Sequence, residues 1–250
     1  METISFPGST GAALSGVLHV PDETARGSVL LAHCFTCSKD LHTVTRLAKA
    51  LAAGGYAALR FDFTGLGESE GSFEQTTVTH DVRDLVHAAT ALIQRGYGPC
   101  ALVGHSLGGA ATLLAAPRIK TVRSVAVIGA PSTPAHVRRL LADGEARIRA
   151  EGSAVVDIGG RPFPIGASFL DDLDTHDQAA SVAELGRPLL VVHAVDDAIV
   201  PVSEGEQTFA AAAQPKAFIP LLDADHLVTA RAAADRLATV LLGWLEATLR

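Results

Sequence analysis

The sequence predicts an α/β fold, with a mostly parallel central sheet and helices on both of its faces. Continuous apolar runs occupy residues 28–33, 56–61, 100–103, 125–128 and 189–193. Continuous rather than alternating apolar residues are typical of strands that are buried on both faces, as in a parallel sheet. Amphipathic segments separate these runs, and such alternation requires crossover helices that cover the sheet.

The chain opens with two strands of a different kind. Residues 3–6 and 14–20 are joined by a turn region that contains Gly8 and Gly11, which predicts an antiparallel entry to the sheet. A further strand is expected at 216–222.

Three segments predict helices. In residues 77–95 the apolar positions recur at steps of three and four, which is the spacing of one helix face. The last segment repeats this spacing from Leu237 to Leu245, and a shorter helix is expected at 109–116.

Length, composition and charge restrict the class of protein. A chain of 250 residues is typical of one domain and is long enough to bury a large core. A net charge of −7 argues against nucleic acid as a partner, because nucleic-acid binding needs a clustered basic face. The sequence has no secretory signal and no apolar run long enough for a membrane span. We therefore expect a cytoplasmic protein with no membrane partner.

One long segment interrupts the alternation of strands and helices. Residues 132–186 contain a basic, helix-like stretch at 136–150 and a hairpin pattern in which Gly159 and Gly160 separate two apolar segments. An insertion of this size between core strands usually has a function. We interpret it as a lid within a single domain that spans residues 1–250.

The strongest chemical motif is G-x-S-x-G at residues 104–108. It directly follows the apolar strand at 101–103 and precedes the helix expected at 109–116. A tight turn between a strand and a helix holds the serine hydroxyl exposed above the sheet edge, and the two glycines let neighbouring backbone approach. This context makes Ser106 the candidate nucleophile.

A nucleophilic serine needs a base and a group that orients the base. In this architecture they follow in the order serine, acid, histidine. The strand at 189–193 runs into Asp196 and Asp197, and the strand at 216–222 is followed by His226. Because ligands of open α/β sheets gather at the carboxyl ends of strands, these residues are the candidate acid and base.

Over its whole length the sequence resembles the α/β-hydrolase superfamily, and the resemblance implies that fold. The stretches AHCFTCSKD, LRFDFTGLGESEG, VGHSLGGAA, IGAPSTPAHV and GRPFPIGASFLDDL are similar to the hydrolase half of bifunctional proteins in which an α/β-hydrolase is fused to an OsmC-like domain. Since the sequence ends with its last expected helix, we expect a stand-alone hydrolase module.

The resemblance also implies roles for individual residues. The superfamily acid lies in a stretch similar to H-G-x-x-D-x-x-V-P, and HAVDDAIVP aligns with it so that Asp197 rather than Asp196 is the acid. Half of the superfamily's oxyanion hole usually comes from a His-Gly-X loop, which reads HCF at residues 33–35. The implied donors are the backbone N–H groups of Phe35 and Leu107.

Cys34 and Cys37 form a C-x-x-C spacing in this loop. The helix pattern begins only near residues 38–42, so Cys34 lies in a turn and not at a helix N-terminus, where a redox thiol gains its reactivity. Three cysteines in a chain of this length also make no disulfide framework. We therefore expect a steric role, in which Cys34 replaces glycine and reductant leaves hydrolysis unchanged. A thiol-redox protein that uses both cysteines is the alternative.

Together these observations predict a serine hydrolase that cleaves carboxylic esters of small or medium acyl chains through an acyl-enzyme. Position alone suggests that Phe163, Phe169 and Leu170 line the substrate pocket. The reaction implies no cofactor and no metal, and the expected partner is a small-molecule ester. The alternatives are a thioesterase, amidase or peptidase with the same catalytic groups, and a non-catalytic binding protein of the same fold.

Overall fold

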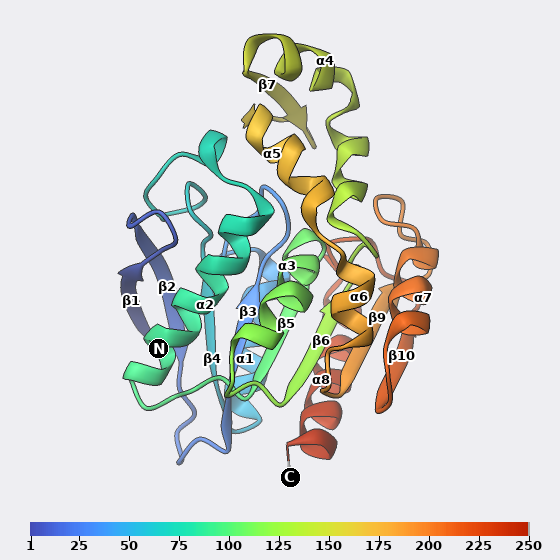
Figure 1. Cartoon of the computed structure of the whole chain (residues 1–250). Coiled ribbons are helices and arrows are strands. Elements are labelled where there is room, and N and C mark those ends of the chain that lie inside the picture. Colours follow the sequence, from blue (N-terminus) through green and yellow to red (C-terminus); the bar gives the residue numbers. More distant parts are fainter. Residues whose placement is uncertain (250) are drawn as a thin grey trace.

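The computed structural model describes residues 1–249, which form an eight-stranded sheet and a separate two-stranded hairpin. The strands of the large sheet are β1 Glu2–Pro7, β2 Ala13–His19, β3 Gly27–Ala32, β4 Tyr56–Phe61, β5 Ala101–His105, β6 Ser124–Ile128, β9 Leu189–Ala194 and β10 Lys216–Leu221. They lie in the order β1-β2-β4-β3-β5-β6-β9-β10 (Figure 1). β2 is antiparallel to β1 and to β4, and all other neighbours are parallel. The predicted mostly parallel sheet with an antiparallel entry is therefore confirmed.

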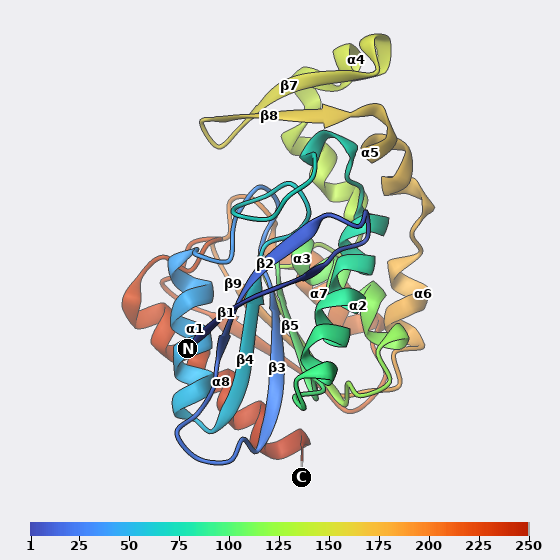
Figure 2. The ribbon, with the colours of Figure 1, turned by 90° about the vertical axis from the view of Figure 1, so that its left-hand side faces the viewer.

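Helices cover both faces of this sheet. The α-helices are α1 His42–Ala53, α2 Val78–Gln94, α3 Leu107–Ala115, α4 Ala142–Glu151, α5 Ala167–Asp172, α6 Gln178–Ala183, α7 Val202–Ala211 and α8 Arg231–Thr248. Short 3-10 helices lie at Phe73–Gln75, Ala116–Arg118, Pro134–Leu140 and Leu173–Thr175. α2, α3, α6 and α7 lie on one face of the sheet, and α1 and α8 lie on the other (Figures 1 and 2). The predicted α/β fold class is confirmed.

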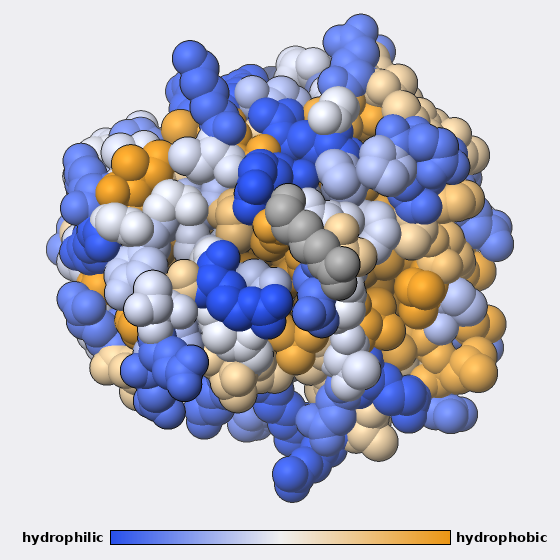
Figure 3. Space-filling view, turned by 90° about the horizontal axis from the view of Figure 1, so that it is seen from below, coloured by the Kyte–Doolittle hydropathy of each residue, from blue (hydrophilic) through white to orange (hydrophobic). Residues whose placement is uncertain are grey.

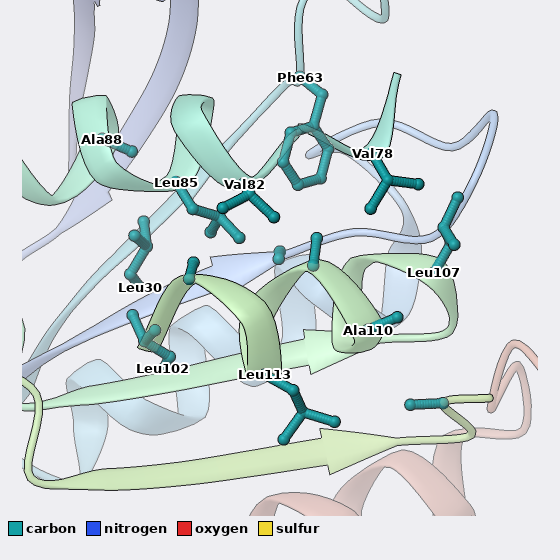
Figure 4. Packing of buried hydrophobic residues seen from close by; sticks show 14 of the residues in the cluster. Leu30, Phe63, Val78, Val82, Leu85, Ala88, Leu102, Leu107, Ala110 and Leu113 are labelled. Atoms are coloured by element: carbon teal, nitrogen blue, oxygen red, sulfur yellow. The ribbon is translucent and has the colours of Figure 1, made fainter. Parts of the chain in front are cut away.

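The core has one apolar layer on each face of the sheet. Figure 4 shows the layer under α2 and α3, where Leu85 of α2 lies over Leu30 and Leu102 of the sheet. Val29 and Leu31, the neighbours of Leu30 in β3, belong to the layer under α1 and α8. Successive side chains of a strand point to opposite faces, so a strand covered on both sides needs an unbroken apolar run. This is why the sequence pattern located the strands.

Residues 132–186, called here the β6–β9 segment, leave the sheet after β6 and return to it before β9. Most of the segment, from the 3-10 helix Pro134–Leu140 to α5, projects beyond the carboxyl ends of the strands, whereas its last helix, α6, lies on a face of the sheet (Figures 1 and 2). It contains the hairpin of β7 Ser153–Ile158 and β8 Arg161–Gly166, whose turn residues Gly159 and Gly160 have φ values of +63° and +79°. Glycine adopts this left-handed conformation readily, which agrees with the hairpin prediction.

The stretch expected to be helix-like at 136–150 is divided in the structure. The 3-10 helix Pro134–Leu140 is followed by Leu141, and α4 begins at Ala142. Leu141 is fully buried, so the break places an apolar side chain in the core while the basic residues on either side remain at the surface.

The face opposite the β6–β9 segment carries widely spread polar and charged side chains, with apolar side chains gathered along one side (Figure 3). Within residues 1–249, no helix is both long enough and apolar enough to cross a bilayer.

Candidate active site

Ser106 lies at a strained turn between β5 and α3. Its backbone has φ +55° and ψ −127°, a conformation that costs free energy for a residue other than glycine. Two close approaches fix this turn. A Cβ atom at Gly108 would lie 2.0 Å from the carbonyl oxygen of His33, and a Cβ at Gly104 would lie 2.5 Å from that of Gly108. Glycine is therefore required at both positions, and the turn carries Ser106 to the carboxyl edge of the sheet.

His226 joins Ser106 to Asp197 in one hydrogen-bonded chain. Asp197 follows β9 and His226 follows β10, so all three side chains approach from the carboxyl ends of strands. His226 Nε2 lies 3.0 Å from Ser106 Oγ, and His226 Nδ1 lies 2.7 Å from Asp197 Oδ2. When Nδ1–H donates to the carboxylate, Nε2 is left to accept the serine hydroxyl proton. The structure thus brings together the three side chains that the sequence predicts for catalysis.

Asp197 is held as a charged acceptor. Its Oδ1 accepts the backbone N–H groups of Ile199 and Val200, each at 2.9 Å. Burial alone would raise the pKa of Asp197, but its hydrogen bond with His226, the charge of His226 and the two N–H groups hold the pKa below its ordinary value. Asp196, the neighbouring candidate, is exposed and lines the cavity mouth without a contact to His226 in the part of the chain that the structure describes.

Two further histidines, His105 and His193, support the loops that carry His226 and Asp197. His105 donates from Nε2 to the carbonyl oxygen of His226 at 2.7 Å, and burial lowers the pKa of His105 to about 3. Its Nδ1 is buried and has no partner among residues 1–249. His193 donates from Nε2 to the carbonyl oxygen of Val200 at 2.8 Å, and burial also lowers its pKa. Both rings are therefore neutral and hold the backbone of His226 and Val200 in place.

The residues that carry the candidate oxyanion donors, Phe35 and Leu107, line a small cavity together with Ser106. Leu107 is the first residue of α3, where a backbone N–H has no partner within the helix. Phe35 N–H makes no hydrogen bond to another described residue. The peptide that carries it is anchored at its other end, because His33 Nδ1–H donates to the Cys34 carbonyl oxygen at 2.8 Å. His33 Nε2 accepts the backbone N–H of Phe63 at 3.3 Å, which fixes the tautomer of the ring.

Cys34 and Cys37 form a disulfide, which the sequence analysis did not predict. The sequence argument used the small number of cysteines and the position of Cys34 before the helix. Neither decides whether the two sulfur atoms lie close enough to bond. The turn brings their Cα atoms to 5.3 Å, within the usual range for a disulfide. The third cysteine, Cys100, is free and buried.

Two cavities reach Ser106. The larger has a volume of about 410 Å³ and is lined by residues that include Cys34, Cys37, Arg161 and His226. The smaller, about 30 Å³, is bounded mainly by apolar side chains and by the backbone of the turn; its lining includes Phe35, Leu107, Pro131, Val137, Leu140, Ile199 and Val200.

Phe163, Phe169 and Leu170, expected at the substrate pocket, do not line either of these cavities. Phe169 stacks on Phe35 with ring centroids 5.2 Å apart, and Phe163 packs edge-on against Phe73 at 5.6 Å. Leu170 is fully buried in the core. Phe169 therefore packs on the loop between β3 and α1 (residues 33–41, called here the Phe35 loop), Phe163 packs on the 3-10 helix Phe73–Gln75, and Leu170 belongs to the core.

The buried side chains of Lys39 and Asp62, together with the exposed Glu68, anchor the far end of the Phe35 loop. Lys39 Nζ donates to Asp62 Oδ2 at 2.8 Å and to Glu68 Oε2 at 2.6 Å, and Lys39 N–H donates to Asp62 Oδ1 at 2.6 Å. Burial alone would lower the pKa of Lys39, but Asp62 and Glu68 raise it above its ordinary value. The ammonium is therefore charged and ties this loop to the loop that follows β4.

Sequence reasoning did not single out His105 or Arg161. The sequence could have pointed to His105, because it lies inside the G-x-S-x-G motif directly before Ser106. Arg161 Nη2 donates to the Thr36 carbonyl oxygen at 2.7 Å, a contact that depends on how the hairpin folds over the Phe35 loop. Within residues 1–249, no group of three or more His, Cys, Asp or Glu side chains is arranged to hold a metal ion.

Comparisons with known proteins agree with this architecture. The chain is 40% identical to the esterase domain of a Rhodothermus marinus protein, and the two structures match with a TM-score of 0.82 over 100% of this chain and 99% of that one. It is 32% identical over 178 residues to the lysophosphatidylserine lipase ABHD12 of Danio rerio, which is 68% of this chain and 43% of the relative. It is 28% identical over 154 residues to the mitochondrial palmitoyl-protein thioesterase ABHD10 of Mus musculus, which is 59% of this chain and 50% of the relative.

The chain spans about half the length of the curated relatives it matches. The Alpha/beta hydrolase family profile matches residues 29–240. From this match and the observed fold we conclude that the chain belongs to the alpha/beta hydrolase family.

Proposed function

We propose that the protein is a serine hydrolase that cleaves carboxylic esters of small or medium acyl chains through a covalent acyl-enzyme. The observation that carries this proposal is the hydrogen-bonded chain from Ser106 through His226 to the buried Asp197. A histidine between a serine hydroxyl and a carboxylate is the arrangement that activates a serine for acyl transfer.

In the proposed reaction, His226 removes the proton from Ser106 as the serine oxygen attacks the ester carbonyl. The N–H groups of Phe35 and Leu107 stabilise the tetrahedral oxyanion, and each contributes about 3 kcal/mol. His226 then protonates the leaving alcohol, which departs and leaves the acyl group on Ser106. Water repeats the sequence and releases the acid.

The two cavities suggest how a substrate is divided between acyl and leaving groups. The small cavity of about 30 Å³ adjoins Ser106 and both oxyanion donors, so we assign the acyl chain to it. Its size favours short chains. The larger and more open cavity of about 410 Å³ then takes the leaving group. The β6–β9 segment supplies residues to both cavities and acts as a lid in this proposal.

A thioester is the second candidate substrate class, because the same groups cleave thioesters and one relative is named a palmitoyl-protein thioesterase. The small cavity favours short esters over a palmitoyl chain. The similarity to the hydrolase half of OsmC-like fusion proteins stays a prediction.

Substrate profiling tests the proposal. The purified protein should hydrolyse p-nitrophenyl esters of short chain length faster than long ones, and faster than acyl-CoA thioesters or peptide anilides. A preference for long-chain thioesters would favour the second candidate, and cleavage of anilides alone would indicate a peptidase.

Activity measured between pH 5 and pH 8 should rise with pH, because His226 accepts the serine proton only when its ring is neutral. The low pKa of Asp197 keeps that carboxylate charged throughout the range, so Asp197 adds no second transition. The measurement is kcat/KM for one short ester at constant ionic strength. A flat profile would argue against a histidine base.

A further inference from the structure

The Cys34–Cys37 disulfide lies in the wall of the catalytic cavity. Both cysteines line the cavity of about 410 Å³ that also contains Ser106 and His226. Cys34 is 4% exposed, whereas Cys37 is half-buried. A small molecule that enters the cavity therefore reaches Cys37 more easily than Cys34.

The disulfide closes the turn that carries the Phe35 N–H group. Inside this turn the Cys34 carbonyl oxygen accepts two hydrogen bonds, from Cys37 N–H at 3.1 Å and from His33 Nδ1–H at 2.8 Å. The C=O and N–H groups of a trans peptide point in opposite directions. Holding the Cys34 carbonyl therefore fixes the direction of the Phe35 N–H on the same peptide.

The backbone conformation of Thr36 is strained, so the turn needs the Cys34–Cys37 disulfide to hold its shape. Its φ is +60°, and a β-branched residue rarely adopts this left-handed conformation. Besides the disulfide, the bond from Arg161 to the Thr36 carbonyl oxygen opposes relaxation of this residue. If the S–S bond is absent, rotation of Thr36 towards negative φ moves the adjacent peptides, and the Phe35 N–H moves with them.

We propose that Cys34–Cys37 is a thiol–disulfide exchange site that takes a small dithiol, and that its redox state sets the rate of hydrolysis by positioning the Phe35 N–H. This inference rests on the proposed function, in which that N–H is half of the oxyanion hole. It replaces the sequence-based expectation that reductant leaves hydrolysis unchanged.

The dithiol supplies both of the electrons that reduce the Cys34–Cys37 disulfide. One thiolate of the dithiol attacks Cys37 Sγ, the S–S bond breaks, and Cys34 leaves as a thiolate that takes up a proton. The second thiol of the reagent loses its proton and attacks the mixed disulfide at the reagent's own sulfur, which releases Cys37 as a thiolate that is then protonated. Two electrons pass from the dithiol to the protein, and the reagent becomes a cyclic disulfide. Excess cyclic disulfide reverses both steps.

Reduction should lower kcat about tenfold and leave KM nearly unchanged. Complete removal of an oxyanion donor costs roughly 10²–10³ in kcat, and a donor that is mobile but present loses part of this. The donor acts on the transition state, so substrate binding is affected little.

The test compares full-length Cys100→Ser protein in buffers with different ratios of reduced to oxidised dithiothreitol. Cys100 lies outside the site, and serine can replace its bonds to the Ser28 backbone, so this variant should keep the wild-type activity and leave one cysteine pair to titrate. Thiols are counted by maleimide labelling and intact mass, and kcat and KM are measured on the same samples. The expected result is a fall in kcat that follows the appearance of two labels and recovers on reoxidation. The Cys34→Ala/Cys37→Ala variant should have the kcat of the reduced protein and no response to dithiothreitol.

Three results would overturn the inference: two labels with unchanged kcat, no labels in the folded protein at any ratio, or a loss of activity that reoxidation does not restore. A rise in KM at constant kcat would also contradict it, because that assigns the loop to substrate binding. Absence of hydrolysis in the oxidised protein would contradict the proposed function instead, and the labels would still decide whether the exchange takes place.

Discussion

Replacement of Ser106 with alanine should abolish ester hydrolysis and leave the fold intact. Among residues 1–249 the hydroxyl makes one hydrogen bond, to His226 Nε2, and alanine adopts the same strained backbone at no greater cost than serine. Loss of a serine nucleophile lowers kcat by roughly 10⁶. The measurement is turnover of a short p-nitrophenyl ester, with the melting temperature as the test of folding.

A matched control is Ser181→Ala, which removes a hydroxyl on α6 that bonds to the Asp177 carbonyl oxygen. It should keep full activity. Labelling by a fluorophosphonate should occur in the wild type and in Ser181→Ala, and disappear in Ser106→Ala. If purified Ser106→Ala kept more than a few per cent of wild-type turnover, the nucleophile would have to be another group.

Asp197→Asn should lower kcat by about 10⁴, the loss seen when a triad acid becomes an amide. The surrounding hydrogen bonds explain why. Ile199 and Val200 N–H groups both donate to Oδ1, so the amide oxygen of Asn takes that position and its NH₂ group faces His226. The NH₂ then donates to Nδ1, which moves the ring proton to Nε2 and prevents that nitrogen from accepting the proton of Ser106.

Asp196→Asn is the control for this prediction. Asp196 is exposed and does not bond to His226, so its amide should cost less than a few-fold in kcat. If Asp196→Asn gave the large loss and Asp197→Asn the small one, the role of acid would belong to Asp196.

The sheet could be predicted from sequence because burial on both faces leaves a direct pattern. Leu30 enters one core layer and its neighbours enter the other, so the whole of β3 must be apolar. The positions of Ser106, Asp197 and His226 could be predicted for a related reason. Each follows a predicted strand, and parallel strands bring their carboxyl ends to a common edge.

The contacts of the Phe35 loop could not be predicted in the same way. The Cys34–Cys37 bond depends on a turn in which Thr36 has positive φ, and no local pattern in TCSK indicates this. The stacking of Phe169 on Phe35 depends on the angle at which the β6–β9 segment leaves the sheet. Contacts between segments distant in sequence are set by packing of the whole chain, which periodicity does not encode.

The pairing of β6 with β9 has a consequence for how such a protein can diversify. These strands are hydrogen-bonded neighbours, with Val125 opposite Leu189 and Ile128 opposite Val192, although about sixty residues separate them in the sequence. The intervening chain leaves the sheet at the carboxyl end of β6, and α6 brings it back to the amino end of the neighbouring strand β9. The part that projects beyond the carboxyl ends can therefore change in length without altering the register of any strand. The loop-closure free energy rises by only about 0.6 kcal/mol for each doubling of the length of the connecting segment. Insertions, deletions or wholesale exchange of this region can therefore accumulate over generations while the catalytic framework is inherited unchanged, and new substrate ranges can arise without a new enzyme.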